Sequence, residues 1–295
     1  MDRSTEEVEE ILLQAKKEGV EEITFTGGEP TIRKDFLELL KFTKNLGFKI
    51  GLQTNGRAFY SKQFVDKVLK IEPRLSFTVP FHHTNPEIFD QITGSAGSSE
   101  QTSEGIKNLI SKGNNNITLK TVVLKQNYTD LPKILTFAVE NEIRAFNITF
   151  PQLCRHTEIY AKKIIPKYKD IKLYLDKVLE RSRRVNLQII LSAIPFCFVS
   201  QRYFAYMDEI NYLKKWVSGD LFKRKTLDST DDILIDLEVN RRSKPKQCKK
   251  CKFYNICLGV WKEYLKLYGD KEFKPVKGEK IETFAELEDL LRKSR

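Results

Sequence analysis

The sequence contains few cysteines, few histidines and no long apolar run. Its 295 residues include five cysteines and three histidines. Five cysteines are too few for a disulfide scaffold in a chain of this length, and no apolar run approaches the roughly 18 residues of a membrane-spanning helix. Residues 1–10 are polar and acidic, which predicts no signal peptide. These absences predict a cytoplasmic protein that does not enter a membrane.

The composition is that of a folded protein with a basic surface. Apolar residues make up 40% of the chain, with 19 Phe and 11 Tyr, which excludes a disordered chain. The length favours two domains. Lys and Arg number 51 against 40 Asp and Glu, a formal net charge of +11. This charge suits nucleic acid or an acidic partner, but a solvated lysine-rich surface is the favoured explanation.

Residues 4–150 alternate short apolar strands with amphipathic helices. Ser4 and Glu7 form a capping box at a helix start, and Ser98 and Gln101 are predicted to form a second one. Largely apolar strands that alternate with helices are typical of a parallel sheet with both faces covered. The pattern therefore predicts an α/β domain, either a TIM-type barrel or a doubly wound sheet. The predicted strands lie at residues 23–26, 48–53, 75–81, 117–124 and 143–150.

Polar residues follow three of these strands, where ligands bind in such folds. Gly27 and Gly28 let a ligand approach the backbone, while Glu29 adds a carboxylate and Pro30 stiffens the exit of the turn. Asn55 follows the second strand and His82 the third. The structural alternatives are a tight turn with a solvated Glu29, and a helix-flanking role for His82 or its neighbour His83.

The first of these turns resembles a known family. Residues 23–30, ITFTGGEP, resemble the second strand and glycine-rich turn of the radical SAM superfamily, and residues 52–56 resemble the end of its third strand. The resemblance covers residues 1–150 and implies a partial (β/α)6 TIM-type barrel that binds S-adenosylmethionine. It indicates no catalytic residue. It implies cofactor contacts from Gly27, Gly28, Glu29, Pro30, Asn55 and His82. In the family, the glycine-rich turn holds the amino group of S-adenosylmethionine.

The chain departs from this family at the residues that bind the reducing cluster. Radical SAM enzymes have a CxxxCxxC loop whose thiolates bind a [4Fe–4S] cluster, but no cysteine precedes Cys154, and the family's first strand is missing. Either the N-terminus is truncated, or the chain is a natural variant that has lost the chemistry. Truncation is favoured because residues 23–26 would otherwise form an exposed apolar edge. As printed, the chain is predicted to be inactive.

Residues 151–295 hold all five cysteines and are predicted to form a second domain. Cys248, Cys251 and Cys257 follow a C-x2-C-x5-C pattern, a spacing that aims thiolates at one metal site. Cys197, after a predicted strand and a proline, is the expected fourth ligand. Cys154 is the alternative ligand, although a small buried apolar role suits it better. Amphipathic helices are expected at residues 165–181 and 281–291, the first of them long.

This second half resembles the auxiliary-cluster domains of SPASM-type and twitch-type radical SAM enzymes. The resemblance implies one auxiliary [4Fe–4S] cluster, and zinc is the alternative metal. The sequence therefore predicts a radical SAM enzyme that cleaves S-adenosylmethionine reductively, takes electrons from a donor and modifies a peptide or small organic substrate. The alternative is a non-catalytic metal-binding protein that contacts nucleic acid or a protein partner through its basic surface.

Overall fold

The computed structural model describes residues 3–152, 160–217 and 240–293. The chain forms two compact units. Unit 1 comprises Met1–Thr121 and Lys133–Phe146, and unit 2 comprises Val122–Pro132 and Asn147–Arg295. Cys154 lies outside the described residues, so its predicted role stays a prediction. Within the described ranges, no helix combines the length and the apolar character needed to cross a bilayer.

The central sheet has six parallel strands in chain order. Ile23 pairs with Ile50, and Leu52 pairs with Phe77. An in-order parallel sheet is typical of a TIM-type barrel, whereas the strand order of a doubly wound sheet reverses. The predicted partial barrel is therefore confirmed. The strands are β1 (Glu22–Phe25), β2 (Lys49–Gln53), β3 (Ser76–Pro80), β4 (Ile117–Val122), β5 (Ala145–Thr149) and β6 (Gln188–Ser192).

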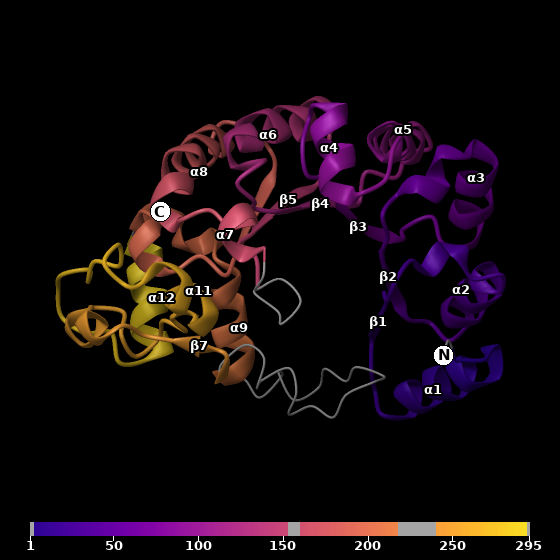
Figure 1. The fold of residues 1–295 in the computed structure, drawn as a ribbon. Coiled ribbons are helices and arrows are strands. Elements are labelled where there is room, and N and C mark those ends of the chain that lie inside the picture. The colour runs from indigo at the N-terminus through magenta and orange to yellow at the C-terminus, as the bar shows by residue number, and fades with distance from the viewer. Residues whose placement is uncertain (1–2, 153–159, 218–239, 294–295) are drawn as a thin grey trace. The chain divides into compact units, whose positions relative to one another are not determined.

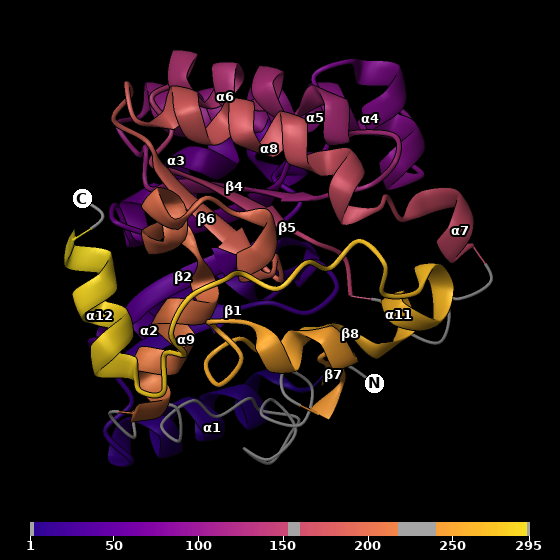
Figure 2. The same cartoon turned by 90° about the vertical axis from the view of Figure 1, so that its left-hand side faces the viewer.

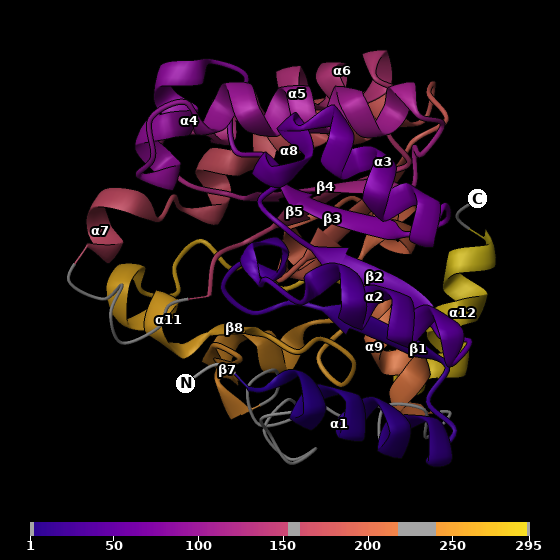
Figure 3. The same cartoon turned by 90° about the vertical axis from the view of Figure 1, so that its right-hand side faces the viewer.

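The helices between the first strands cover the sheet with their apolar stripes. Figure 1 and Figure 3 show α1, α2 and α3 on one side of β1 and β2. On α3, Val65 and Val68 are fully buried, and Ser61 caps the helix by accepting a hydrogen bond from the Phe64 N–H at 3.3 Å. The helices up to β5 are α1 (Thr5–Lys17), α2 (Phe36–Asn45), α3 (Lys62–Ile71), α4 (Pro86–Thr93), α5 (Ser98–Ser111) and α6 (Leu131–Glu140).

One of the two predicted capping boxes is wrong. The box of Ser4 and Glu7 is present at the start of α1. At α5, however, Ser98 is already helical, and Gly97, with φ of +76°, stands at the cap without a side chain. The Asp90 carboxylate replaces the expected cap, because it accepts hydrogen bonds from the Gly97 N–H at 2.6 Å and the Ser99 N–H at 2.8 Å.

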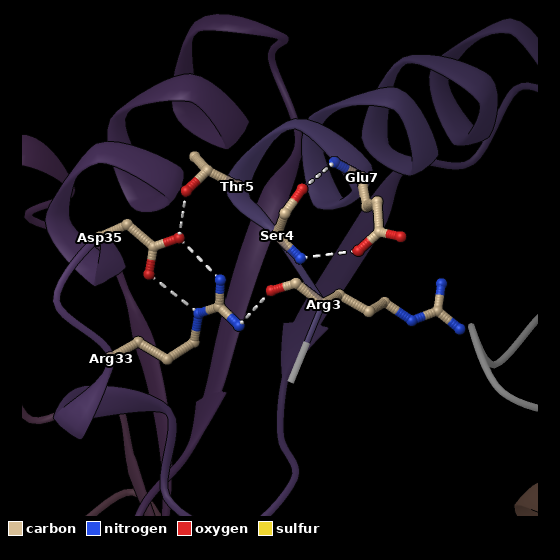
Figure 4. Close-up of polar contacts among 6 residues, drawn as sticks. All are labelled: Arg3, Ser4, Thr5, Glu7, Arg33 and Asp35. Carbon is tan, nitrogen blue, oxygen red and sulfur yellow. Dashed lines mark hydrogen bonds and ion pairs between the residues drawn. The ribbon is translucent and has the colours of Figure 1, made fainter. Parts of the chain in front are cut away.

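The start of α1 is held against the segment that follows the glycine-rich turn. Asp35 accepts hydrogen bonds from Thr5 Oγ1 at 2.7 Å and from Arg33 Nε at 2.9 Å, and Arg33 also donates to the Arg3 carbonyl at 3.1 Å. Figure 4 shows this arrangement beside the capping box. We call Arg3, Thr5, Arg33 and Asp35 the α1 clamp.

Unit 2 combines helices with a small antiparallel pair of strands, and aromatic residues fill its core. Tyr168 stacks on Phe150 with ring centroids 3.8 Å apart, and Tyr264 lies 4.9 Å from Tyr168. The two predicted amphipathic helices appear as α8 and α12. The helices and strands after β5 other than β6 are α7 (Ala161–Ile164), α8 (Tyr168–Ser182), α9 (Asp208–Val217), β7 (Arg242–Ser243), β8 (Val260–Trp261), α11 (Lys262–Tyr268) and α12 (Phe284–Lys293).

Candidate functional site

The carboxylate of Glu29 links the turn after β1 to the end of β2. Its Oε1 accepts hydrogen bonds from Thr54 Oγ1 at 2.8 Å and Thr31 Oγ1 at 2.6 Å, and its Oε2 accepts from the Asn55 N–H at 2.7 Å. A carboxylate in this position fixes two strand-end turns relative to each other. Glu29 is therefore not simply solvated, and the turn that it holds is pre-organised.

The two glycines of this turn leave its backbone accessible. Gly27 and Gly28 are exposed, and a Cβ atom placed on either would meet no atom within 4 Å. Packing therefore does not require glycine at these positions. Gly27 has φ of +131°, a conformation that side chains of L-residues rarely adopt. Pro30 is buried and starts a short 3₁₀-helix, Pro30–Ile32. The turn thus presents open backbone on a rigid base.

Asn55 and its neighbour Thr54 position the same turn. The Asn55 side-chain oxygen accepts a hydrogen bond from the Arg57 N–H at 2.9 Å, and its carbonyl accepts one from Thr102 Oγ1 at 2.9 Å. Thr54 is 3% exposed and also accepts from the Gly56 N–H at 3.1 Å. Sequence reasoning missed Thr54, and its position between β2 and Asn55 was the available signal.

The two adjacent histidines after β3 have different environments. His83 is buried, and its Nδ1 accepts a hydrogen bond from the Asn85 N–H at 2.8 Å, so the helix-flanking role belongs to this residue. The Nδ1 of His82 is buried without a hydrogen-bond partner. Burial lowers the pKa of His82 to about 4, so the imidazole is neutral at pH 7. Such an atom suits a hydrogen bond to a ligand.

Unit 1 contains no cysteine. Its residues therefore do not supply the three thiolates of a CxxxCxxC loop, which binding of the reducing cluster requires. The residues near the glycine-rich turn fit the organic cofactor but not that cluster.

Four cysteines of unit 2 line one small cavity. Cys197 lies on the 3₁₀-helix Phe196–Phe198, and Cys248 lies on the 3₁₀-helix Lys246–Lys250. Cys251 and Cys257 follow within the next turns, and none of the four forms a disulfide. The cavity is also lined by Phe196, Lys244, Phe253 and Lys274. We call this space the cysteine cavity. It joins all four predicted ligands from two segments far apart in the sequence.

Local backbone geometry directs these cysteines. Ala193, just after β6, has a positive φ of 59°, and its carbonyl accepts a hydrogen bond from Tyr168 Oη at 3.0 Å, which holds this strained turn before Cys197. Gly259 has φ of +85°, and a Cβ there would lie 2.4 Å from the Ser243 carbonyl oxygen. Only glycine fits at that position, and its N–H donates to Cys257 Sγ at 3.4 Å.

The electrostatics of the cavity disfavour four bare thiolates. Burial, and then the neighbouring cysteines, raise the pKa of Cys197 well above its ordinary value and that of Cys248 to about 11. A cationic metal site would lower the pKa values of these thiols, because it stabilises the deprotonated sulfur. Across the described residues, no three His, Cys, Asp or Glu side chains converge as a single metal ion requires.

A buried ion pair lies near the cavity. Glu209 on α9 accepts a hydrogen bond from Arg242 on β7 at 3.0 Å, and both side chains are less than one-tenth exposed. The Arg242 guanidinium stacks over the ring of Trp261, 4.4 Å from its centroid. The negative charge of Glu209 contributes to the raised pKa of Cys257, after the larger effect of burial. The Glu209 carboxylate therefore affects the pKa of a thiol in the cysteine cavity.

Comparisons with known proteins agree with these features. Over 191 residues the chain is 30% identical to a probable GTP 3',8-cyclase of Sulfurisphaera tokodaii, which covers 62% of this chain and 60% of that protein. It is 26% identical over 189 residues to an Fe-coproporphyrin III synthase of Methanosarcina barkeri, covering 62% and 45%. The chain thus spans about 60% or less of the length of these relatives.

A solved structure has a similar fold. The crystal structure of Streptococcus suis SuiB matches with a TM-score of 0.54 and 22% identity, covering 64% of this chain and 43% of SuiB. The model of the Radical SAM superfamily matches residues 1–138. This part of the chain contains the glycine-rich turn, Asn55 and His82. Residues 1–138 are therefore similar to the radical SAM superfamily, as the turn after β1 predicts.

Proposed function

We propose that this chain supplies the cofactor-binding turn and the auxiliary-cluster unit of a radical SAM enzyme that modifies a peptide or small organic substrate. The observation that supports this most is the cysteine cavity, where Cys197 joins the C-x2-C-x5-C segment. Chance would not bring four of five cysteines to one cavity in a chain with so few. Members of the superfamily use S-adenosylmethionine and [4Fe–4S] clusters, and a cluster exchanges single electrons when bound.

In unit 1, the backbone of Gly27 and Gly28 would meet the amino group of S-adenosylmethionine. Glu29 has both oxygens occupied by Thr31, Thr54 and Asn55, so its main task is to position this backbone. The unpartnered Nδ1 of His82 would accept a hydrogen bond from the ligand. The site binds and orients the cofactor without a charged histidine.

In unit 2, the cavity favours a cluster over zinc. A zinc ion holds four thiolates at about 2.3 Å from one atom, whereas the thiolates of a [4Fe–4S] cluster bind its separate irons. The thiols line the cavity but do not converge on one point. The backbone N–H groups of Gly259 and Val276 each donate to a cysteine sulfur at 3.4 Å, as is suitable for ligands of such a cluster.

The substrate class follows from relatives rather than from the site. SuiB has been crystallised with its precursor peptide SuiA, and the first matching relatives are named for cyclisation of a nucleotide. Both are organic molecules of moderate size. A peptide or a small organic molecule is therefore the proposed substrate of this chain.

Anaerobic reconstitution with iron and sulfide tests the proposal. We expect about four irons and four labile sulfides per chain, with broad absorption near 400 nm. The double variant Cys248→Ser/Cys251→Ser should lose this absorption. Cys154→Ser is the matched control, because Cys154 is outside the predicted ligand set. A colourless protein with one zinc per chain and no labile sulfide would contradict the auxiliary cluster.

A second assay separates the two units. With dithionite and S-adenosylmethionine, these 295 residues are expected to form no 5′-deoxyadenosine, because they contain no CxxxCxxC sequence. Product formation that disappears in the Cys248→Ser/Cys251→Ser variant would show that the cysteine cavity reduces the cofactor. That result would overturn the auxiliary assignment.

A further inference from the structure

Most of the net positive charge of the chain lies in the segment that contains three of the cysteines. Residues 241–280 include thirteen Lys and Arg and four Asp and Glu, a net charge of +9 out of the total of +11. The remaining residues are therefore close to neutral. This uneven distribution is not what an evenly solvated lysine-rich surface would show.

The charges border the cysteine cavity. Residues 246–252 run beside residues 270–281, since the Lys252 N–H donates to the Val276 carbonyl at 2.8 Å and the Ile281 N–H donates to the Lys252 carbonyl at 2.9 Å. Figure 2 shows the segment after α11 running back past β8 toward α12. Six of the exposed lysines of these two segments form what we call the lysine rim: Lys246, Lys249, Lys250, Lys274, Lys277 and Lys280.

Carboxylates of the described residues do not neutralise the rim. Within the part of the chain that the structure describes, none of the six lysines forms an ion pair. Glu272, a half-buried acid in the second segment, is occupied by hydrogen bonds from the Lys169 N–H at 2.9 Å and from Tyr264 Oη. Lys249 and Lys250 lie between Cys248 and Cys251, and Lys274 lines the cavity itself. Rim lysines therefore lie beside the cavity thiols in sequence and, at Lys274, in space.

The chemistry of the rim argues against nucleic acid. Residues 246–252 and 270–281 contain no arginine, whereas arginine is the usual residue for bidentate contacts to phosphate and guanine. Single-stranded nucleic acids also need exposed aromatic rings for stacking. Here Phe253 and Tyr264 are buried, and Lys244 and Lys280 lie over the ring of Tyr254 at 4.7 and 5.7 Å. The rim offers point charges without a stacking surface.

Point charges around a redox site suit a weak, electrostatically steered encounter. Complementary charge raises the association rate without demanding a large interface, and electron-transfer complexes are among the smallest interfaces. We propose that the lysine rim is the docking surface for an acidic one-electron carrier protein that serves the cysteine cavity. This inference rests on the auxiliary cluster of the proposed function.

Binding of a purified flavodoxin with a net negative charge tests the docking surface. The iron-loaded chain should bind it at low salt, and binding should weaken markedly between about 20 and 200 mM salt as screening increases. The variant Lys249→Gln/Lys250→Gln/Lys274→Gln should raise the Kd about tenfold. The matched control Lys62→Gln/Lys67→Gln/Lys70→Gln removes three exposed charges from α3 and should change the Kd less than twofold.

Two results would overturn the proposal. One is equal flavodoxin binding by the rim variant and the α3 control. The other is tighter binding of a single-stranded oligonucleotide than of flavodoxin, lost in the rim variant, which would make the rim a nucleic-acid surface. Iron and labile sulfide are measured in the same samples. A chain that assembles no cluster overturns this inference together with the proposed function, whereas a loaded chain that binds no flavodoxin overturns this inference alone.

Discussion

Two side chains at the strand ends of unit 1 differ in how their polar atoms are satisfied. Glu29 uses both carboxylate oxygens in hydrogen bonds to Thr54, Asn55 and Thr31. His82 buries its Nδ1 without any partner. A buried unpaired acceptor costs free energy, so residues of this kind are often retained for a ligand. At the scale of single residues, Glu29 therefore positions the turn and His82 is free to contact what binds there.

His82 should remain neutral throughout the physiological pH range. Its pKa is lowered from 6.5 to about 4 by burial. Between these values the unfolded chain binds a proton that the folded chain does not, so the free energy of unfolding falls as the pH drops, by up to about 3 kcal/mol. Histidine ring resonances followed by NMR check this, with the His82→Gln variant to assign the signal. An inflection near pH 6.5 for His82 would contradict the buried environment.

At the scale of elements, the α1 clamp joins a helix start to the turn that precedes α2. Ser4 and Glu7 satisfy the first amides of α1, while Asp35 and Arg33 hold the same end from the side. Each contact contributes little to the free energy of unfolding, but all of them stabilise the first helical turn. The clamp therefore fixes the first turn of α1 against the chain that leaves Glu29.

Loss of the clamp should loosen the first turn of α1. The variant Ser4→Ala/Asp35→Asn removes the cap and weakens the ion pair, and loss of a cap alone costs about 1 kcal/mol. Amide hydrogen exchange at Glu6 to Glu10 should then accelerate about fivefold or more through local opening. Lys34→Ala, at an exposed site next to the clamp, is the control and should leave the exchange rates unchanged. Unaltered exchange in the double variant would show that the clamp is energetically neutral.

At the scale of the whole molecule, the chemistry is divided between the two units. The glycine-rich turn lies in unit 1, and the four cysteines of the cavity lie in unit 2. Both tryptophans of the chain, Trp216 and Trp261, also belong to unit 2. Tryptophan fluorescence therefore reports on the unit that contains the proposed cluster.

Removal of the metal should destabilise unit 2. A ligand that binds only the folded state adds several kcal/mol to its stability, and for a unit of this size that corresponds to a decrease in Tm of about 10 °C when the metal is removed. Thermal unfolding followed by tryptophan fluorescence, with and without a chelator, measures this. In Cys248→Ser/Cys251→Ser the chelator should have no effect. A Tm that stays constant although iron has been removed would exclude a structural contribution from the metal.

The sequence by itself determined the features that depend on neighbours along the chain. Apolar periodicity and local caps predicted the strands up to β5 and the helix α1, because these signals act within one or two turns. The GGEP turn indicated the family, and the spacing of Cys248, Cys251 and Cys257 indicated a metal site, because both patterns are short and contiguous. The predicted cap at Ser98 was wrong because the pattern is local. The carboxylate that accepts the hydrogen bond from the Ser99 N–H belongs to Asp90, in the preceding helix.

Only the tertiary structure decided which distant residues meet. It placed Cys197 in one cavity with the other three cysteines. It brought Thr54 within hydrogen-bond distance of Glu29 and left the Nδ1 of His82 buried without a hydrogen-bond partner. It also brought residues 246–252 beside residues 270–281, so that dispersed lysines became a rim around the cavity. These outcomes depend on hydrogen bonds and burial between segments far apart in the sequence, which no local pattern encodes.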